Sequence, residues 1–101
     1  MDFTQKWSEI RRALSKGLNI QTWSAAGGDL DRSFRIERVG PDAVDILPTG
    51  GGNIQSVSRR DFEFVWSAWD DYKARKVPRY RLTRIRTSSY VIGILHYVET
   101  R

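Results

Sequence analysis

The sequence contains no cysteine and only one histidine. The missing thiols exclude disulfide scaffolds, thiolate zinc sites, iron–sulfur clusters and cysteine nucleophiles. A catalytic triad or a histidine-rich metal site built on His96 would lack partners, because Ser88 or Ser89 alone does not supply them. The carboxylates of Asp29 and Asp31 fall far short of a calcium-binding loop. We therefore expect a non-enzymatic protein that holds no metal and no other cofactor.

The chain also lacks an apolar run near the roughly 18 residues that a membrane-spanning helix needs. Its first residues show no basic stretch followed by an apolar one, so no secretory signal is visible and we expect a cytoplasmic protein. Of its 101 residues, 40% are hydrophobic and 29% are charged, which is typical of a globular protein. This length and composition predict a single domain over residues 1–101.

Hydrophobic periodicity predicts an α+β fold that begins with a helix over about residues 3–17. Four apolar residues recur there at helical spacing: Phe3, Trp7, Ile10 and Leu14. Asp2 can cap the start of this helix. Apolar and polar residues then alternate, and the turns between these stretches are short. Such turns predict a small antiparallel meander of three or four strands, because parallel strands need long crossovers. The expected strands cover residues 19–24, 33–39, 43–47 and 53–57.

We expect two or three helices in the C-terminal part of the chain. Ser58, followed by Asp61 three residues later, has the pattern of a capping box and predicts a helix as far as about Lys73. The buried face of this helix is expected to consist of four residues: Phe62, Val65, Trp66 and Trp69. Phe64 lies on the far side of the helical wheel, so it is either covered by a second layer or exposed.

The last segment, residues 87–98, is compatible with a helix and with a strand. Its β-branched and aromatic residues favour a strand, and Gly93 disfavours a helix by about 1 kcal/mol. The length of the segment and its broad apolar face favour a helix, which Thr87, Ser88 or Ser89 can cap. Pro78 ends the preceding helical region and permits a new start. We therefore predict a final helix.

Charge is distributed unevenly along the chain, whose net charge is +5. Residues 1–71 include nine basic and eleven acidic residues, whereas residues 72–101 include eight basic residues and one acidic residue. Seven of these eight form a cluster, here called the basic segment: Lys73, Arg75, Lys76, Arg79, Arg81, Arg84 and Arg86. Such a block favours an anionic partner, and guanidinium groups pair bidentately with phosphate. The basic segment therefore predicts binding of nucleic acid or another polyanion, through backbone contacts rather than base readout.

Aromatic residues supply a second set of candidates. Tyr72 and Tyr80 are interleaved with the basic residues, and Trp23 lies on a short predicted strand. Four aromatic residues are therefore expected to contact a ligand or a partner: Trp23, Phe64, Tyr72 and Tyr80. The other three tryptophans fit apolar helix faces and are expected in the core.

Two alternatives stay open. The chain can be a homodimer or another interaction adaptor that uses Trp- and Tyr-rich helix faces. In that case the arginines would pair with nearby acids: Asp61, Glu63, Asp70 and Asp71. A small-molecule pocket for an anionic ligand, between the sheet and the helix that carries Trp66 and Trp69, is the other alternative.

Three short motifs resemble functional signatures but depart from them. Residues 27–29, Gly-Gly-Asp, resemble the start of the signature loop of cyclic-dinucleotide synthases, but the Glu-Phe of that signature is missing. The glycine run at 50–52 lacks the following helix and the Lys-Ser or Lys-Thr pair of a phosphate loop. A Pro-Asp pair ending at Asp42, with Asp71 and Lys73, matches a pattern of metal-dependent nucleases. That chemistry needs both carboxylates at one metal, and we expect them in a turn and at a helix end.

Overall fold

The computed structural model describes residues 2–101. In this range an N-terminal helix precedes a four-stranded antiparallel sheet, and helices follow, so the predicted α+β fold is confirmed. The elements are α1 (Phe3–Ala13), β1 (Asn19–Ser24), β2 (Gly28–Val39), β3 (Ala43–Pro48), β4 (Gln55–Ser58), α2 (Arg59–Ser67), α3 (Trp69–Lys73), the 3₁₀ helix η1 (Arg79–Arg81) and α4 (Ser88–Thr100).

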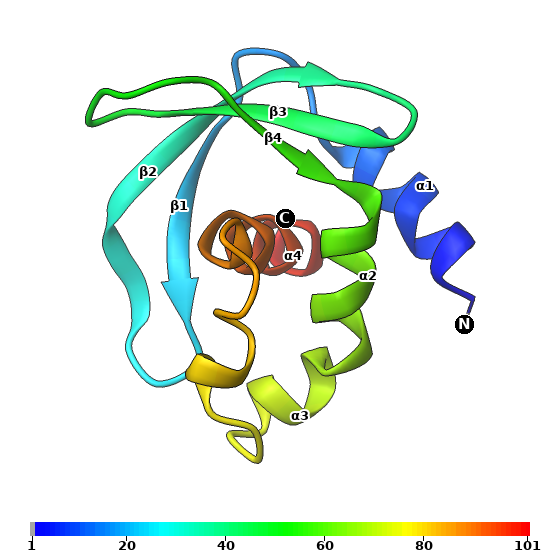
Figure 1. The fold of residues 1–101 in the computed structure, drawn as a ribbon, viewed down its shortest axis with the longest axis vertical. Coiled ribbons are helices and arrows are strands. Elements are labelled where there is room, and N and C mark those ends of the chain that lie inside the picture. The colour runs from blue at the N-terminus through cyan, green and yellow to red at the C-terminus, as the bar shows by residue number, and fades with distance from the viewer. Residues whose placement is uncertain (1) are drawn as a thin grey trace.

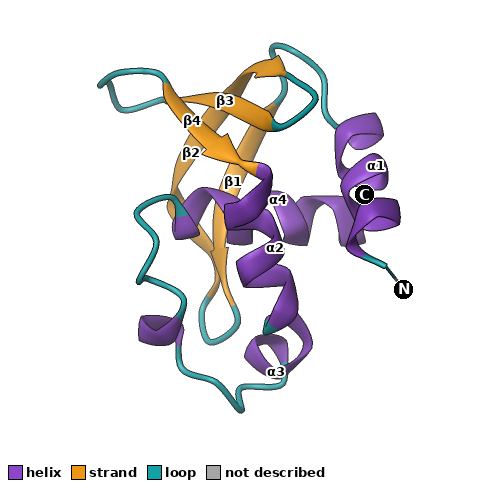
Figure 2. Ribbon diagram, turned by 45° about the vertical axis from the view of Figure 1, so that its right-hand side comes forward, coloured by secondary structure: helices purple, strands orange, loops and turns teal. Residues whose placement is uncertain are grey.

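The sheet is a meander in the order β1-β2-β3-β4, and each strand is antiparallel to the next. It curves around α4, which is seen nearly end-on in Figure 1, while α2 packs on another side of the same helix. Helix α1 also packs on α4, and Figure 2 shows it near the C-terminal end of α4. Two hydrogen bonds tie α1 to the β2–β3 turn: Trp7 Nε1 donates to Pro41 O at 2.8 Å and Arg11 Nε to Gly40 O at 2.8 Å.

Helix α4 lies at the centre of the molecule, and most of its first three turns is buried. The approach to the sheet is close at Gly93, where a Cβ atom would lie 3.1 Å from Gln21 O and 3.2 Å from the Phe34 ring. The glycine that counts against a helix in the sequence is thus the residue that lets the helix pack directly on β1 and β2. The expected side-chain cap is not formed in the described chain, and Thr87 Oγ1 donates to Asp61 Oδ2 at 2.7 Å.

Helix α1 is shorter than predicted, since it ends at Ala13. Leu14 is already extended, with φ −100° and ψ 144°. The chain then joins the sheet: Gly17 N donates to Ile36 O, and Ile36 N donates to Leu18 O, each at 2.8 Å. Backbone pairing with β2 therefore replaces the last helical turn. The predicted cap is present, because Asp2 Oδ1 accepts from Thr4 N at 3.1 Å.

Strand β2 begins at Gly28, five residues before the predicted start. The added residues pair with the end of β1, with Gly28 opposite Ser24 and Asp29 opposite Trp23. This end of the hairpin is rich in polar residues, so it lacks the alternation by which a half-buried strand is identified. Strand β1 has the predicted bounds, and β3 and β4 lie within two residues of theirs.

The helix predicted as far as Lys73 is divided into α2 and α3 by Ala68, which has φ −116° and ψ 8°. Ser58 caps α2 as predicted, since its Oγ accepts from Asp61 N at 3.2 Å. Val65 and Trp69, on either side of Ala68, are both buried, with exposed fractions of 0% and 1%. No helix in residues 2–101 is long and apolar enough to cross a membrane.

Candidate polyanion-binding surface

The basic segment runs from the end of α3 through η1 to the start of α4, along the outer edge of the molecule (Figure 2). Successive turns order its backbone: Lys76 N donates to Asp71 O at 2.8 Å, and Leu82 N to Arg79 O at 2.9 Å. The Leu82 side chain is only 1% exposed and belongs to the core. One buried leucine and a series of turns therefore hold this connection in place.

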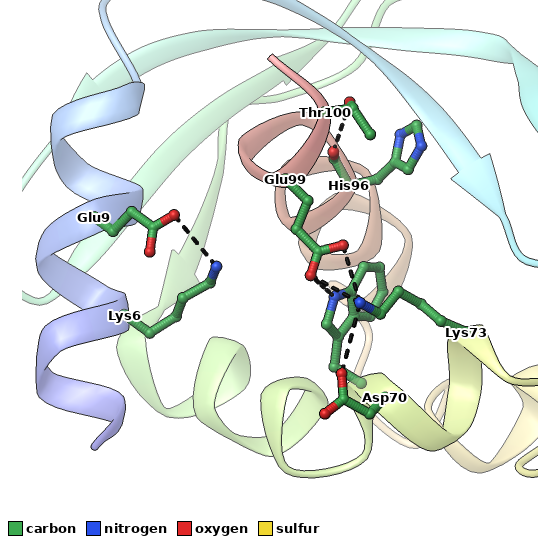
Figure 3. Close-up of polar contacts among 8 residues, drawn as sticks. Lys6, Glu9, Asp70, Lys73, His96, Glu99 and Thr100 are labelled. Carbon is green, nitrogen blue, oxygen red and sulfur yellow. Dashed lines mark hydrogen bonds and ion pairs between the residues drawn. The ribbon is translucent and has the colours of Figure 1, made fainter. Parts of the chain in front are cut away.

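Lys73 forms ion pairs with two acidic residues of the protein (Figure 3). Its Nζ lies 2.9 Å from Glu99 Oε1 and 3.6 Å from Asp70 Oδ1. The same Glu99 oxygen accepts from Trp69 Nε1 at 2.8 Å, and the ammonium lies 5.4 Å from the centre of the Trp69 ring. The charge of Lys73 is therefore compensated within the protein, by Asp70, which is among the acids named above as partners, and by Glu99, which is not.

Arg79 points into the protein and is half-buried. Its Nη1 donates to Tyr72 Oη at 2.9 Å and to Trp23 O at 3.1 Å, and its Nη2 donates to Ser89 Oγ at 3.4 Å. These acceptors are neutral, and within residues 2–101 Arg79 forms no ion pair with an acid. Its contacts join η1 to β1, α3 and α4.

Arg84 covers an aromatic ring. The centre of its guanidinium lies 5.7 Å from the ring centre of Phe64, which is half-buried on α2. Arginine stacks favourably on aromatic faces because its charge is delocalised and weakly hydrated. Of the two options left open for Phe64, partial cover is thus the one observed, and a residue of the basic segment provides it.

The other four cations of the basic segment are exposed: Arg75, Lys76, Arg81 and Arg86. None of them makes an ion pair or a side-chain hydrogen bond with any residue from 2 to 101. Among the acids considered as internal partners, Asp70 pairs with Lys73, and Asp61 accepts from a threonine. Glu63 and Asp71 form no ion pair in the described chain. The segment therefore combines compensated and uncompensated cations.

A separate ion pair lies on β2, away from the basic segment. Arg35 Nη2 donates to Glu37 Oε1 at 2.9 Å. This hydrogen bond lowers the pKa of the Glu37 carboxyl below its usual value and raises the pKa of Arg35. Arg35 is exposed, so we expect this pair to contribute little to stability.

The aromatic candidates have different environments. Trp23 stacks on His96, with ring centres 4.2 Å apart and planes at 8°, and it meets Tyr72 edge-on at 6.3 Å. Tyr72 is buried, whereas Tyr80 in η1 is 71% exposed among the cations of the basic segment. The structure therefore places Trp23 and Tyr72 in an internal aromatic cluster and leaves Tyr80 at the surface. Trp66, which was expected in the core, is half-buried with Lys6 Nζ 4.8 Å from its ring centre.

A cavity of about 670 Å³ is a functional candidate that the sequence reasoning missed. It lies between β2, the β3–β4 loop, η1 and the first turn of α4, with Arg32 and Arg79 in its wall. The sequence predicts a small-molecule pocket in another place, between the sheet and the helix that carries Trp66 and Trp69. Gly50 and Gly51 of the glycine run line this cavity, but local sequence does not show that Arg79 lines it as well.

The short motifs do not assemble a site in the described chain. Asp42 lies in the β2–β3 turn and Asp71 in α3, and Gly28 begins a strand in a hairpin. Residues 2–101 contain no group of three or more His, Asp or Glu side chains placed to hold a metal ion.

Comparisons with protein-family models, with curated proteins and with solved structures found no match. In its fold and surface, this is a small α+β protein with an ordered, cation-rich connection before its last helix.

Proposed function

We propose that the protein binds nucleic acid or another polyanion through the exposed cations of the basic segment. The observation that carries this proposal is that Arg75, Lys76, Arg81 and Arg86 are exposed and have no ionic partner within residues 2–101. The function assigned is binding rather than catalysis.

The electrostatics of the segment support this function. Its backbone is ordered by turns, and its four exposed cations fall within residues 75–86 of the chain, where like charges repel one another. A polyanion relieves this repulsion and releases its own condensed counterions, which makes the binding sensitive to salt. Contacts to phosphates fix position without reading sequence, so we propose binding that depends little on base sequence.

Tyr80 adds a contact of a different kind. Its ring is 71% exposed and lies between Arg79 and Arg81 in the chain. Single-stranded nucleic acids bind where cations contact the backbone and an aromatic face stacks on a base. We therefore propose that single strands bind more tightly than duplexes of the same length. Tyr80→Ala should remove this preference while leaving most of the duplex binding.

Fluorescence anisotropy with labelled single strands and duplexes of equal length, across a salt series, tests the proposal. The test variant combines Lys76→Ala, Arg81→Ala and Arg86→Ala, which removes three exposed cations without removing a hydrogen bond. We expect the slope of log K against log[salt] to decrease in magnitude by roughly one for each phosphate that the variant no longer neutralises.

A matched control removes the same charge from another part of the surface. Arg12, Lys16 and Arg38 are exposed and form no ion pair within the described chain, so Arg12→Ala/Lys16→Ala/Arg38→Ala changes the net charge equally. This control should bind nearly as the wild type does. Equal weakening in the two variants would show that only net charge matters, and absence of any binding at low salt would refute the proposal.

A homodimer or interaction adaptor is the alternative that the sequence left open. It would use aromatic helix faces, but Trp7 and Trp69 are buried inside the protein, with exposed fractions of 3% and 1%. Light scattering after size exclusion separates the two functions. A dimer that ignores nucleic acid and heparin would favour the alternative, whereas a monomer that binds both in a salt-dependent way would support the proposed function.

A further inference from the structure

The cavity beside the first turn of α4 contains an excess of positive charge. Arg32 and Arg79 line it, and Asp31 is the acidic residue of the same wall. None of the three forms an ion pair within residues 2–101. Its volume of about 670 Å³ falls in the range of roughly 300–1,000 Å³ that small-molecule sites occupy.

Arg79 is held in a fixed position at this wall. Tyr72 Oη accepts from its Nη1 at 2.9 Å, and the Tyr72 oxygen is itself positioned by the backbone N–H of Ala25, at 3.1 Å. A cation removed from water is costly unless an anion accompanies it, yet the neighbours that hold Arg79 are neutral. A ligand that carries negative charge would supply the missing partner without rearranging the guanidinium.

Two residues with hydroxyl donors, Ser89 and Tyr90, line the same cavity as this cation. Ser89 Oγ accepts from Arg79 Nη2 at 3.4 Å, and Tyr90 Oη accepts from Gln55 Nε2 at 3.2 Å, so each hydroxyl proton is free to be donated. An arginine fork with two hydroxyl donors matches a group that has three acceptor oxygens better than a carboxylate, which has two. Gly50 and Gly51 form part of the wall and present backbone rather than side chains.

We infer that this cavity binds a phosphate monoester, with Arg79 and Ser89 on the phosphate and the remaining volume available to a polar organic part. Two sources share this chemistry: a free sugar phosphate and the terminal 5′-phosphate of a nucleic acid. The inference does not rest on the proposed function, because Lys76, Arg81 and Arg86 do not line the cavity.

Gly50 offers a sharp test that leaves the internal contacts of Arg79 in place. A Cβ atom added there meets no atom within 4 Å, and Gly50 does not need a positive φ. Gly50→Glu places a carboxylate at the cavity wall, and Gly50→Gln adds the same bulk without charge. Isothermal titration calorimetry with ribose 5-phosphate, and with ribose as the uncharged reference, then measures binding to the wild type and to both variants.

We expect saturable binding of ribose 5-phosphate but not of ribose. We also expect about tenfold or greater weakening in Gly50→Glu and less than about threefold weakening in Gly50→Gln. Arg79→Lys should weaken binding as well, because a point charge cannot replace the fork. Equal binding of the two sugars, or equal effects of the two Gly50 variants, would overturn the inference.

Competition with oligonucleotides distinguishes the two sources of the phosphate. A 5′-phosphorylated oligonucleotide that displaces a labelled strand better than its 5′-hydroxyl form, in a manner sensitive to Gly50→Glu, identifies the nucleic-acid end. Ribose 5-phosphate binding without that difference identifies the free metabolite. If neither ligand responds to Gly50→Glu, the cavity is not a phosphate site.

The triple variant Lys76→Ala/Arg81→Ala/Arg86→Ala should bind ribose 5-phosphate as the wild type does. Failure of the cavity site can therefore be distinguished from failure of the proposed function.

Discussion

Two groups of cations in the basic segment have the same chemistry but different surroundings. Lys73 and Arg79 contact the protein, one through carboxylates and the other through neutral oxygens. Lys76, Arg81 and Arg86 are exposed to solvent. Basic residues that are neighbours in the sequence therefore have different roles in this protein. The engaged cations hold the connection to the core, and the exposed ones are available to a partner.

The apolar anchor of the segment should matter most for stability. Leu82→Ala removes a side chain that is 1% exposed, so we expect the free energy of unfolding to fall by about 2–5 kcal/mol. Urea denaturation measures this change, with Ile54→Ala, at 58% exposure, as a control that should change it by less than about 0.5 kcal/mol. Similar effects of the two substitutions would mean that Leu82 does not anchor the connection.

Arg79→Ala should have the next largest effect on stability. It leaves Tyr72 Oη and the Trp23 carbonyl without one of their donors, which should cost about 1–2 kcal/mol of unfolding free energy. Arg79→Lys should recover part of this stability, because an ammonium can still donate to one of the two acceptors. Chemical denaturation of both variants makes the comparison. If Arg79→Ala were as stable as the wild type, Arg79 would not be one of the cations that hold the connection to the core.

Lys73→Ala should destabilise the protein less, by about 0.2–1 kcal/mol, because its ion pairs are partly exposed to solvent. The effect should shrink in about 1 M salt, which screens such charges. Denaturation curves at low and high salt test this expectation. An undiminished effect at high salt would assign the role of Lys73 to packing on Trp69 rather than to its charge.

The exposed cations should have the smallest effect on stability. The triple variant Lys76→Ala/Arg81→Ala/Arg86→Ala should unfold within about 0.5 kcal/mol of the wild type, since these side chains touch no internal partner in the described chain. Thermal denaturation at low salt measures it. A larger decrease would show that these cations support the fold and would remove the contrast between the two groups.

Local pattern was enough to predict the class of the fold and its order of elements. The spacing of Phe3, Trp7 and Ile10 identified α1, and the short turns identified the meander. The break at Ala68 and the early start of β2 were missed. The early start of β2 rests on the pairing of Asp29 with Trp23 at a polar hairpin end, which lacks the alternation that marks a strand. The break at Ala68 has no glycine or proline beside it to mark it in the sequence.

The candidate site was predictable in composition but not in arrangement. Counting charges located the basic segment, and the structure shows which of its members have partners. The Glu99 that pairs with Lys73 is 26 residues away, and the Trp23 carbonyl that holds Arg79 is 56 residues away. No local pattern reports such contacts, because they form only when α4 and β1 pack beside the segment.

The sequence by itself determined the periodic elements and the excess of positive charge before the last helix, since periodicity and charge are properties of neighbouring residues. The tertiary structure alone decided which cations are compensated and where a cavity forms, because both depend on distances between segments that fold together. Gly93 shows the same division: its cost to a helix can be read from the residue type, but its use in bringing α4 close to Phe34 follows only from packing.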